Sequence, residues 1–155
     1  MFDSIPKVVG DCCADLFAAY ALPLERVGEA SNRPEVCAVL GTTGDLQGTA
    51  ILATTIACVN ATNPVGDSRG WISELVNQLV GRIKNELLRH RIEIVISTPV
   101  ALRGDRLAPV GGGEVFRSPA GEVHVWFDFE PAEGAAWQDT ADDTAVASEG
   151  DVLLF

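Results

Sequence analysis

The sequence lacks the residue patterns that mark common metal and redox sites. Its four cysteines, Cys12, Cys13, Cys37 and Cys58, show no C-x-x-C spacing, and its two histidines stand alone. A zinc site is therefore not expected. Adjacent cysteines rarely bridge each other, so we expect all four to be small buried apolar residues in a reducing compartment. We expect no disulfide and no metal ligand from this chain.

Basic residues and long apolar runs are also scarce. The chain has 11 lysines and arginines against 22 acidic residues, for a net charge of −11. Binding to a phosphate backbone requires a basic footprint, so a nucleic-acid partner is excluded. No apolar run reaches the roughly 18–20 residues that span a bilayer, and the start, MFDSIPKVVGDCC, does not resemble a signal peptide. We expect a cytoplasmic protein without membrane insertion.

The length and composition are those of one folded domain with a separate acidic end. The 155 residues are 47% hydrophobic, which is enough for a real core. Residues 131–155 contain six acidic residues and no basic one. We therefore place the domain at 1–130 and a flexible acidic tail at 131–155. Its acidic composition fits a solvated end, whereas Trp137 and the final VLLF fit a docking peptide, and both interpretations stay open.

Apolar periodicity predicts two long helices and a sheet. Helical spacing covers 6–20 and 69–89, with a short helix and a loop between 56 and 67. Strands are expected at 35–41, 48–55, 92–98, 114–118 and 122–130, with a glycine-rich loop at 103–114. In the last strand the alternation of Val123, Val125, Phe127 and Phe129 indicates one buried face. The fold class is α+β, a mostly antiparallel sheet packed by two long helices.

The helix at 69–89 places unusual residues opposite its apolar stripe. At 100° per residue from Ile72, Glu74 falls near about 200° and Asn77 near about 140°, with Gly70 and Gly81 on the same side. Asparagine and glycine are poor helix formers, so propensity gives no reason for them. Small residues would let a partner approach, the carboxylate could pair with a cation, and the carboxamide could orient a water molecule.

Simpler interpretations exist for each pattern. Glu-x-x-Asn alone also fits a solvated helix face, and the chain has a second such pair, Glu29 and Asn32, in a predicted loop. The segments GTTGDLQGT and GGGE suggest a small-molecule phosphate enzyme. However, neither matches G-x-x-x-x-G-K-[ST], and a hairpin explains the first.

The wider pattern resembles the CheC/CheX/FliY family of chemotaxis phosphatases. That family carries Glu-x-x-Asn on a helix and a proline about 22 residues after the asparagine; here ELVNQLVG supplies the pair, and Pro99 follows Asn77 by 22 residues. The strand GTAILATT and the segment ISTPVALRG are also similar to CheX-type sequences. The first helix has Asp11 and Ala14 at the corresponding places, so the chain resembles a CheX-type member with a single site.

The resemblance implies a fold, an activity and partners. It implies two long pseudo-symmetric helices and dephosphorylation of a phosphorylated CheY-type response regulator in chemotaxis or related two-component signalling. Glu74 and Asn77 would be catalytic, and Gly70, Gly81 and Pro99 would help to bind the partner. The chain would need no cofactor of its own, since the regulator's site supplies Mg²⁺.

Two further expectations follow from the resemblance. The family often has Asp or Ser where this chain has Gly70, which leaves open a catalytically weak module that only binds a response regulator or another signalling protein. The family also implies a homodimer through sheet edges, with the strand at 122–130 as the candidate edge.

Overall fold

Apolar residues at helical spacing form both predicted helices in the computed structural model, which describes residues 1–63, 66–104 and 112–139. α1 spans Ile5–Ala19, with a proline in its first turn, and follows a short 3₁₀ turn, η1 (Phe2–Ser4). α3 spans Ser68–Leu88 and is capped by Asp67, whose side chain accepts a hydrogen bond from the Arg69 N–H at 3.2 Å. The helices expected at 6–20 and 69–89 are confirmed.

The strands form one antiparallel sheet within the described residues. In order along the sheet they are β1-β6-β7-β3-β2-β4, with β5 also beside β2 and β8 beside β3. Their bounds are Glu25–Val27 (β1), Val36–Gly44 (β2), Leu46–Thr54 (β3), Ile94–Ile96 (β4), Val100–Arg103 (β5), Gly112–Ser118 (β6), Gly121–Phe127 (β7) and Glu130–Pro131 (β8). The predicted α+β class is confirmed, and the short helix expected after β3 is α2 (Ile56–Thr62). The sequence pattern missed β1, β5 and β8, which are too short to show periodicity.

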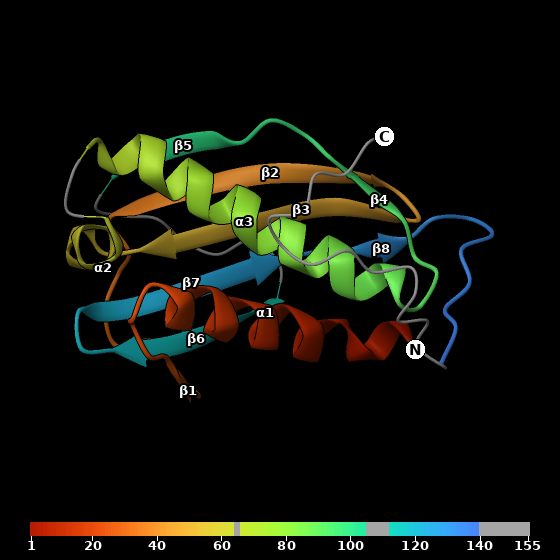
Figure 1. Cartoon of the computed structure of the whole chain (residues 1–155), viewed down its shortest axis with the longest axis horizontal. Coiled ribbons are helices and arrows are strands. Elements are labelled where there is room, and N and C mark those ends of the chain that lie inside the picture. Colours follow the sequence, from red (N-terminus) through yellow and green to blue (C-terminus); the bar gives the residue numbers. More distant parts are fainter. Residues whose placement is uncertain (64–65, 105–111, 140–155) are drawn as a thin grey trace.

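Both long helices cover the same face of the sheet (Figure 1). α1 contacts β6 and β7, whereas α3 contacts β2, β3 and β5, and the two helices also contact each other. Between the layers, side chains such as Phe17 and Leu79 from the helices and Leu40, Leu52 and Val125 from the strands are fully buried. This core fixes the rotation of α3 and therefore decides which of its residues face outward.

The face of β7 turned away from the helices is also buried, which corrects the expectation of one buried face. Glu122, His124 and Trp126 are 2%, 3% and 5% exposed. The loop before β2 lies over this end of the sheet, because Ser31 donates to the Glu122 carboxylate through its N–H and its hydroxyl, and Asn32 donates through its N–H. In the loop pair of Glu29 and Asn32, the backbone N–H of Asn32 makes this contact.

The buried carboxylate and imidazole on this face have perturbed pKa values. Burial raises the pKa of Glu122, but hydrogen bonds from Asn32 and Ser31 and the nearby His124 outweigh it, so the pKa lies below its ordinary value. Burial lowers the pKa of His124, and Glu122 at 3.6 Å offsets this only in part. Both groups tie the fold's stability to pH.

The position of β7 corrects the expected dimer edge. β7 lies between β6 and β3, so it has no free edge to pair with a second chain. In the described residues the outer strands are β1 on one side and β4 with β5 on the other. A dimer through sheet edges would have to use one of these.

The packed domain extends beyond the boundary expected at residue 130. The Trp137 ring stacks on His90 with ring centroids 4.3 Å apart, and the Gln138 N–H donates to the His90 carbonyl oxygen at 3.0 Å. The aromatic contact anchors residues 131–139 to the end of α3. The rest of the predicted tail, including VLLF, lies outside the described residues. None of the helices in the described ranges has the length and apolar content needed to cross a membrane.

Candidate functional site

The core side of α3 is a continuous apolar stripe. Each residue of the stripe is fully buried: Ile72, Leu75, Val76, Leu79, Val80, Ile83 and Leu87. Burying these side chains against β2 and β3 stabilises the helix far more than its intrinsic propensity does. The opposite face therefore remains free to carry residues that helix formation does not favour.

Glu74 and Asn77 lie side by side on this outward face, as the helical wheel predicted. Both side chains are exposed, and they are i, i+3 neighbours. A Cβ added at Gly70 or Gly81 would meet no atom within 4 Å apart from its own helix. The pair is thus flanked by open space along the helix, into which the surface of another protein could fit.

The two polar side chains differ in their contacts. The Glu74 Oε1 accepts a hydrogen bond from the Gln78 Nε2 at 3.2 Å. Among the residues that the structure describes, none forms a hydrogen bond with the Asn77 carboxamide. Glu74 is therefore held by Gln78, while the donor and the acceptor of the Asn77 carboxamide are both available to an external group.

Pro99 lies in the sheet layer and not on α3. It occupies the link between β4 and β5, where the pairing of β2 passes from Ile96 to Val100. Just before it, the Ser97 hydroxyl accepts a hydrogen bond from the Gly41 N–H at 2.8 Å. A proline, which has no N–H to pair, suits this interruption in the ladder. The structure thus accounts for Pro99 locally, and its expected part in binding a partner stays a prediction.

α1 does not carry an equivalent pair. Asp11 is exposed but forms a salt bridge with Lys7 of the same helix at 2.6 Å, and Ala14 is half-buried with no polar group. The single site on α3 stays a prediction.

Sequence patterns missed two hydrogen bonds that connect Glu74 to α1 through Gln78. The Tyr20 hydroxyl, at the end of α1, donates to the Gln78 Oε1 at 2.7 Å, and Gln78 in turn donates to Glu74. The i, i+4 spacing of Glu74 and Gln78 could have indicated their contact. No sequence signal pairs Tyr20 with Gln78, since 58 residues separate them.

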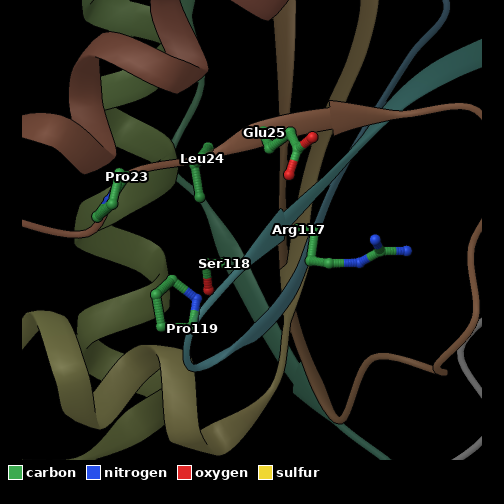
Figure 2. A pocket seen from close by; sticks show the side chains of 6 residues that line it. All are labelled: Pro23, Leu24, Glu25, Arg117, Ser118 and Pro119. Carbon is green, nitrogen blue, oxygen red and sulfur yellow. The ribbon is translucent and has the colours of Figure 1, made fainter.

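The other concave features of the surface offer weaker chemistry. A cleft of about 430 Å³ is lined by six residues from the α1–β1 link, β1, the end of β6 and the β6–β7 turn, namely Pro23, Leu24, Glu25, Arg117, Ser118 and Pro119 (Figure 2). The Ser118 hydroxyl in this cleft already donates a hydrogen bond to the Gly121 carbonyl oxygen at 2.7 Å. The Arg117 side chain extends away from Ser118 and Pro119. This cleft does not bring together a nucleophile and an anion-binding group.

The glycine-rich segment GTTGDLQGT is the β2–β3 hairpin. Gly44 has a φ of +90°, which only glycine adopts easily, and the next residue, Asp45, accepts a hydrogen bond from the Glu93 N–H at 2.8 Å. The hairpin interpretation is confirmed. The second segment, GGGE, falls partly outside the described residues, and its last two glycines begin β6.

The cysteines are buried thiols, as expected from their spacing. Cys12, Cys13, Cys37 and Cys58 are all free and buried. Burial raises the pKa of Cys12 to about 12, which keeps it in the unreactive thiol form. Across the described parts of the chain, no three His, Cys, Asp or Glu residues gather as a metal site would require.

Comparison with known proteins identifies the architecture. No protein-family model matches the sequence, and no curated protein does either. Among solved structures, the chemotaxis protein CheX from Vibrio vulnificus matches with a TM-score of 0.71 and 14% identity, over 81% of this chain and 96% of that one. The chain has the CheX-like fold.

Two further CheX structures support this assignment. CheX from Desulfovibrio desulfuricans matches with a TM-score of 0.67 and 20% identity, over 82% of this chain and 99% of that one. CheX from Borrelia burgdorferi, solved in a complex with CheY, BeF₃ and Mg²⁺, matches with a TM-score of 0.63 and 14% identity, over 80% of this chain and 96% of that one. The CheX-like fold thus spans nearly the whole of each related structure, which supports the two-layer architecture expected from the sequence.

Proposed function

We propose that this chain is a CheX-type phosphatase that removes the phosphoryl group from the aspartate of a CheY-type response regulator. The observation that carries the proposal is the exposed pair of Glu74 and Asn77 on α3, flanked by open space at Gly70 and Gly81. The pair stands in a CheX-like fold, and the Borrelia burgdorferi protein of this fold was solved with CheY bound.

Asn77 is assigned to position the attacking water. Hydrolysis of an aspartyl phosphate needs a water molecule in line with the phosphorus–oxygen bond to the aspartate. The carboxamide can accept a hydrogen bond from that water and donate one to a phosphoryl oxygen. The water oxygen then bonds to phosphorus and the phosphorus–oxygen bond to the aspartate breaks. The aspartate leaves as a carboxylate, and inorganic phosphate leaves with both protons of the water.

Glu74 is assigned to dock the regulator. Its carboxylate is exposed and can pair with a lysine beside the phosphorylated aspartate, which would fix the position of α3 relative to the phosphoryl group. The regulator's own Mg²⁺ and lysine neutralise the charge on the phosphoryl oxygens. This chain therefore needs only to position the water and the regulator. Positioning can raise the rate of hydrolysis by roughly 10²-fold or more.

A binding module without strong hydrolytic activity is the second candidate function. The observation in its favour is Gly70, which leaves empty the place four residues before the glutamate. The family that the sequence resembles often has Asp or Ser at that place. Such a module would dock the regulator through Glu74 and leave its phosphoryl group in place.

A homodimer is proposed through the edge formed by β4 and β5. Among the described residues, three large apolar side chains on these strands are exposed, namely Val95, Val100 and Leu102. An apolar outer strand is a ready site for pairing with a second copy. If sedimentation shows a monomer at micromolar concentration, or a dimer that Val100→Lys leaves intact, this edge is not the interface.

The deciding experiment for the function follows the decay of a phosphorylated regulator. Each CheY-type regulator of the same cell is phosphorylated, and the lifetime of its phosphoryl group is measured with and without this protein. A shortened lifetime that depends on Asn77 supports the phosphatase. Binding to a beryllofluoride-activated regulator without any change in lifetime would favour the binding module. Absence of both binding and decay for every regulator would refute both candidates.

A further inference from the structure

We propose that Gln78 and Tyr20 are positioning residues that hold the Glu74 carboxylate ready for docking. The inference rests on the proposed function and assigns a role to two residues outside the Glu-x-x-Asn motif. Its basis is a continuous relay: Tyr20 donates to Gln78 at 2.7 Å, and Gln78 donates to Glu74 at 3.2 Å.

The relay has only one consistent direction. The Glu74 carboxylate is an acceptor when ionised, so the side of Gln78 that faces it must be the amide NH₂ group. The carbonyl oxygen of Gln78 then faces Tyr20, whose hydroxyl can donate to it. Every donor therefore meets an acceptor, and a flipped Gln78 amide would break both bonds.

The far end of the relay is anchored in the rigid part of the fold. The Tyr20 ring packs edge-on against Trp71, with centroids 5.4 Å apart and an interplanar angle of 88°. The Trp71 Nε1–H donates to the Thr62 hydroxyl oxygen at 2.9 Å. The end of α1, the end of α2 and the first half of α3 are thus joined behind Glu74, and the tyrosine cannot easily turn away.

This anchoring matters because a free glutamate on a helix surface samples many rotamers. Ordering such a side chain when a partner binds costs conformational entropy. The relay orders Glu74 before the partner arrives, whereas Asn77 beside it has no such support among the described residues. The difference matches their assigned roles, because the docking residue must be in place before binding and the water-positioning residue acts afterwards.

The test separates a positioning role from a merely structural contact. Tyr20→Phe removes one hydroxyl and keeps the ring against Trp71, and Gln78→Met keeps the length of the side chain but removes both hydrogen bonds. Each variant is made alone and together with Glu74→Ala. Asn85→Ala, which replaces a half-buried asparagine on the same helix, is the control. The measurements are affinity for a beryllofluoride-activated regulator, phosphoryl decay across regulator concentrations, and the thermal midpoint.

We expect each single variant to weaken binding and raise KM roughly three- to tenfold, with the larger effect for Gln78→Met, because that variant loses both hydrogen bonds and Tyr20→Phe loses one. kcat should stay within about twofold, since the Asn77 step is untouched. In the Glu74→Ala background neither variant should weaken binding further, because nothing remains to be positioned. Asn85→Ala should match the wild type.

Three results overturn the positioning role. One is unchanged affinity in both variants while Glu74→Ala weakens binding. Another is that the variants lose affinity equally in the wild-type and Glu74→Ala backgrounds. The third is a loss of affinity that follows the thermal midpoint, as misfolding would produce. If the wild type neither binds nor dephosphorylates any regulator, the proposed function fails, and the positioning role fails with it.

Discussion

Asn77→Ala tests the assignment most directly, because the residue is exposed and makes no hydrogen bond to the described part of the chain. The change should leave the core intact, since the apolar stripe lies on the opposite face of α3. Alanine is the better helix former by about 0.5 kcal/mol. For a domain of this size that gain should raise the thermal midpoint by about 1–2 °C.

The expected effect on activity has the opposite sign. If the carboxamide holds the attacking water, its loss should slow assisted dephosphorylation by about 10²-fold, equivalent to about 2.7 kcal/mol of transition-state stabilisation. Binding to a beryllofluoride-activated regulator should change by less than about threefold, since the water matters in the transition state and little for docking. A slower, more stable and still binding variant is the signature of a residue kept for function at some cost in stability.

The assay compares phosphoryl decay, binding and thermal unfolding in the wild type, Asn77→Ala and Asn85→Ala. The control substitutes the same residue type on the same helix and should retain full activity. Full activity in Asn77→Ala would refute the assigned role. Equal loss in the control would show that any change on this helix disturbs docking, and a lowered midpoint would attribute the loss to unfolding.

The remaining predictions concern docking and acid stability. Glu74→Ala should lower affinity and rate together, and raised salt should diminish the difference in affinity from the wild type. Gly81→Ala should stabilise the fold by about 0.5–1 kcal/mol in thermal unfolding, because its Cβ would meet open space, yet weaken regulator binding, because the added methyl group would occupy the open space beside Glu74 and Asn77. The pKa values of Glu122 and His124 are lower in the folded state, so the unfolded chain binds protons first and stability falls on acidification. The loss should begin below pH 6.5 with His124 and continue below pH 4.5 with Glu122, the ordinary values of the two groups. Glu122→Gln should abolish the lower step in pH-dependent denaturation and enlarge the upper one, because the neutral amide no longer offsets the lowering of the His124 pKa. A flat profile in the wild type would contradict the buried pair.

The hydrogen bonds between Glu122 and the loop before β2 should contribute measurably to the free energy of unfolding. Glu122→Ala leaves the Ser31 and Asn32 N–H groups without their acceptor, so it should cost about 3 kcal/mol of unfolding free energy. Denaturant unfolding measures this directly, and Glu133→Ala, an exposed carboxylate, is the control. A cost no larger than that of the control would show that the carboxylate does not stabilise the loop.

Local periodicity was enough to predict the helices and the rotation of α3. The stripe from Ile72 to Leu87 repeats at helical spacing, and burial of that stripe necessarily turns Glu74 and Asn77 outward. The hairpin at Gly44 and the burial of the cysteines followed from equally local rules. In these cases the pattern of apolar residues leaves a single arrangement that buries them.

Only tertiary structure decided the features that depend on residues far apart in the chain. β7 is a central strand because β3 and β6 pair with its two edges, and its second face is buried because the loop at Ser31 lies over it. An alternating pattern cannot show what covers that face. Trp137 extends the domain past residue 130 because His90 stacks against it. Tyr20 supports Glu74 through Gln78 because the end of α1 lies beside α3. Periodicity determines which face of an element is buried, whereas only packing determines which partners meet across the fold.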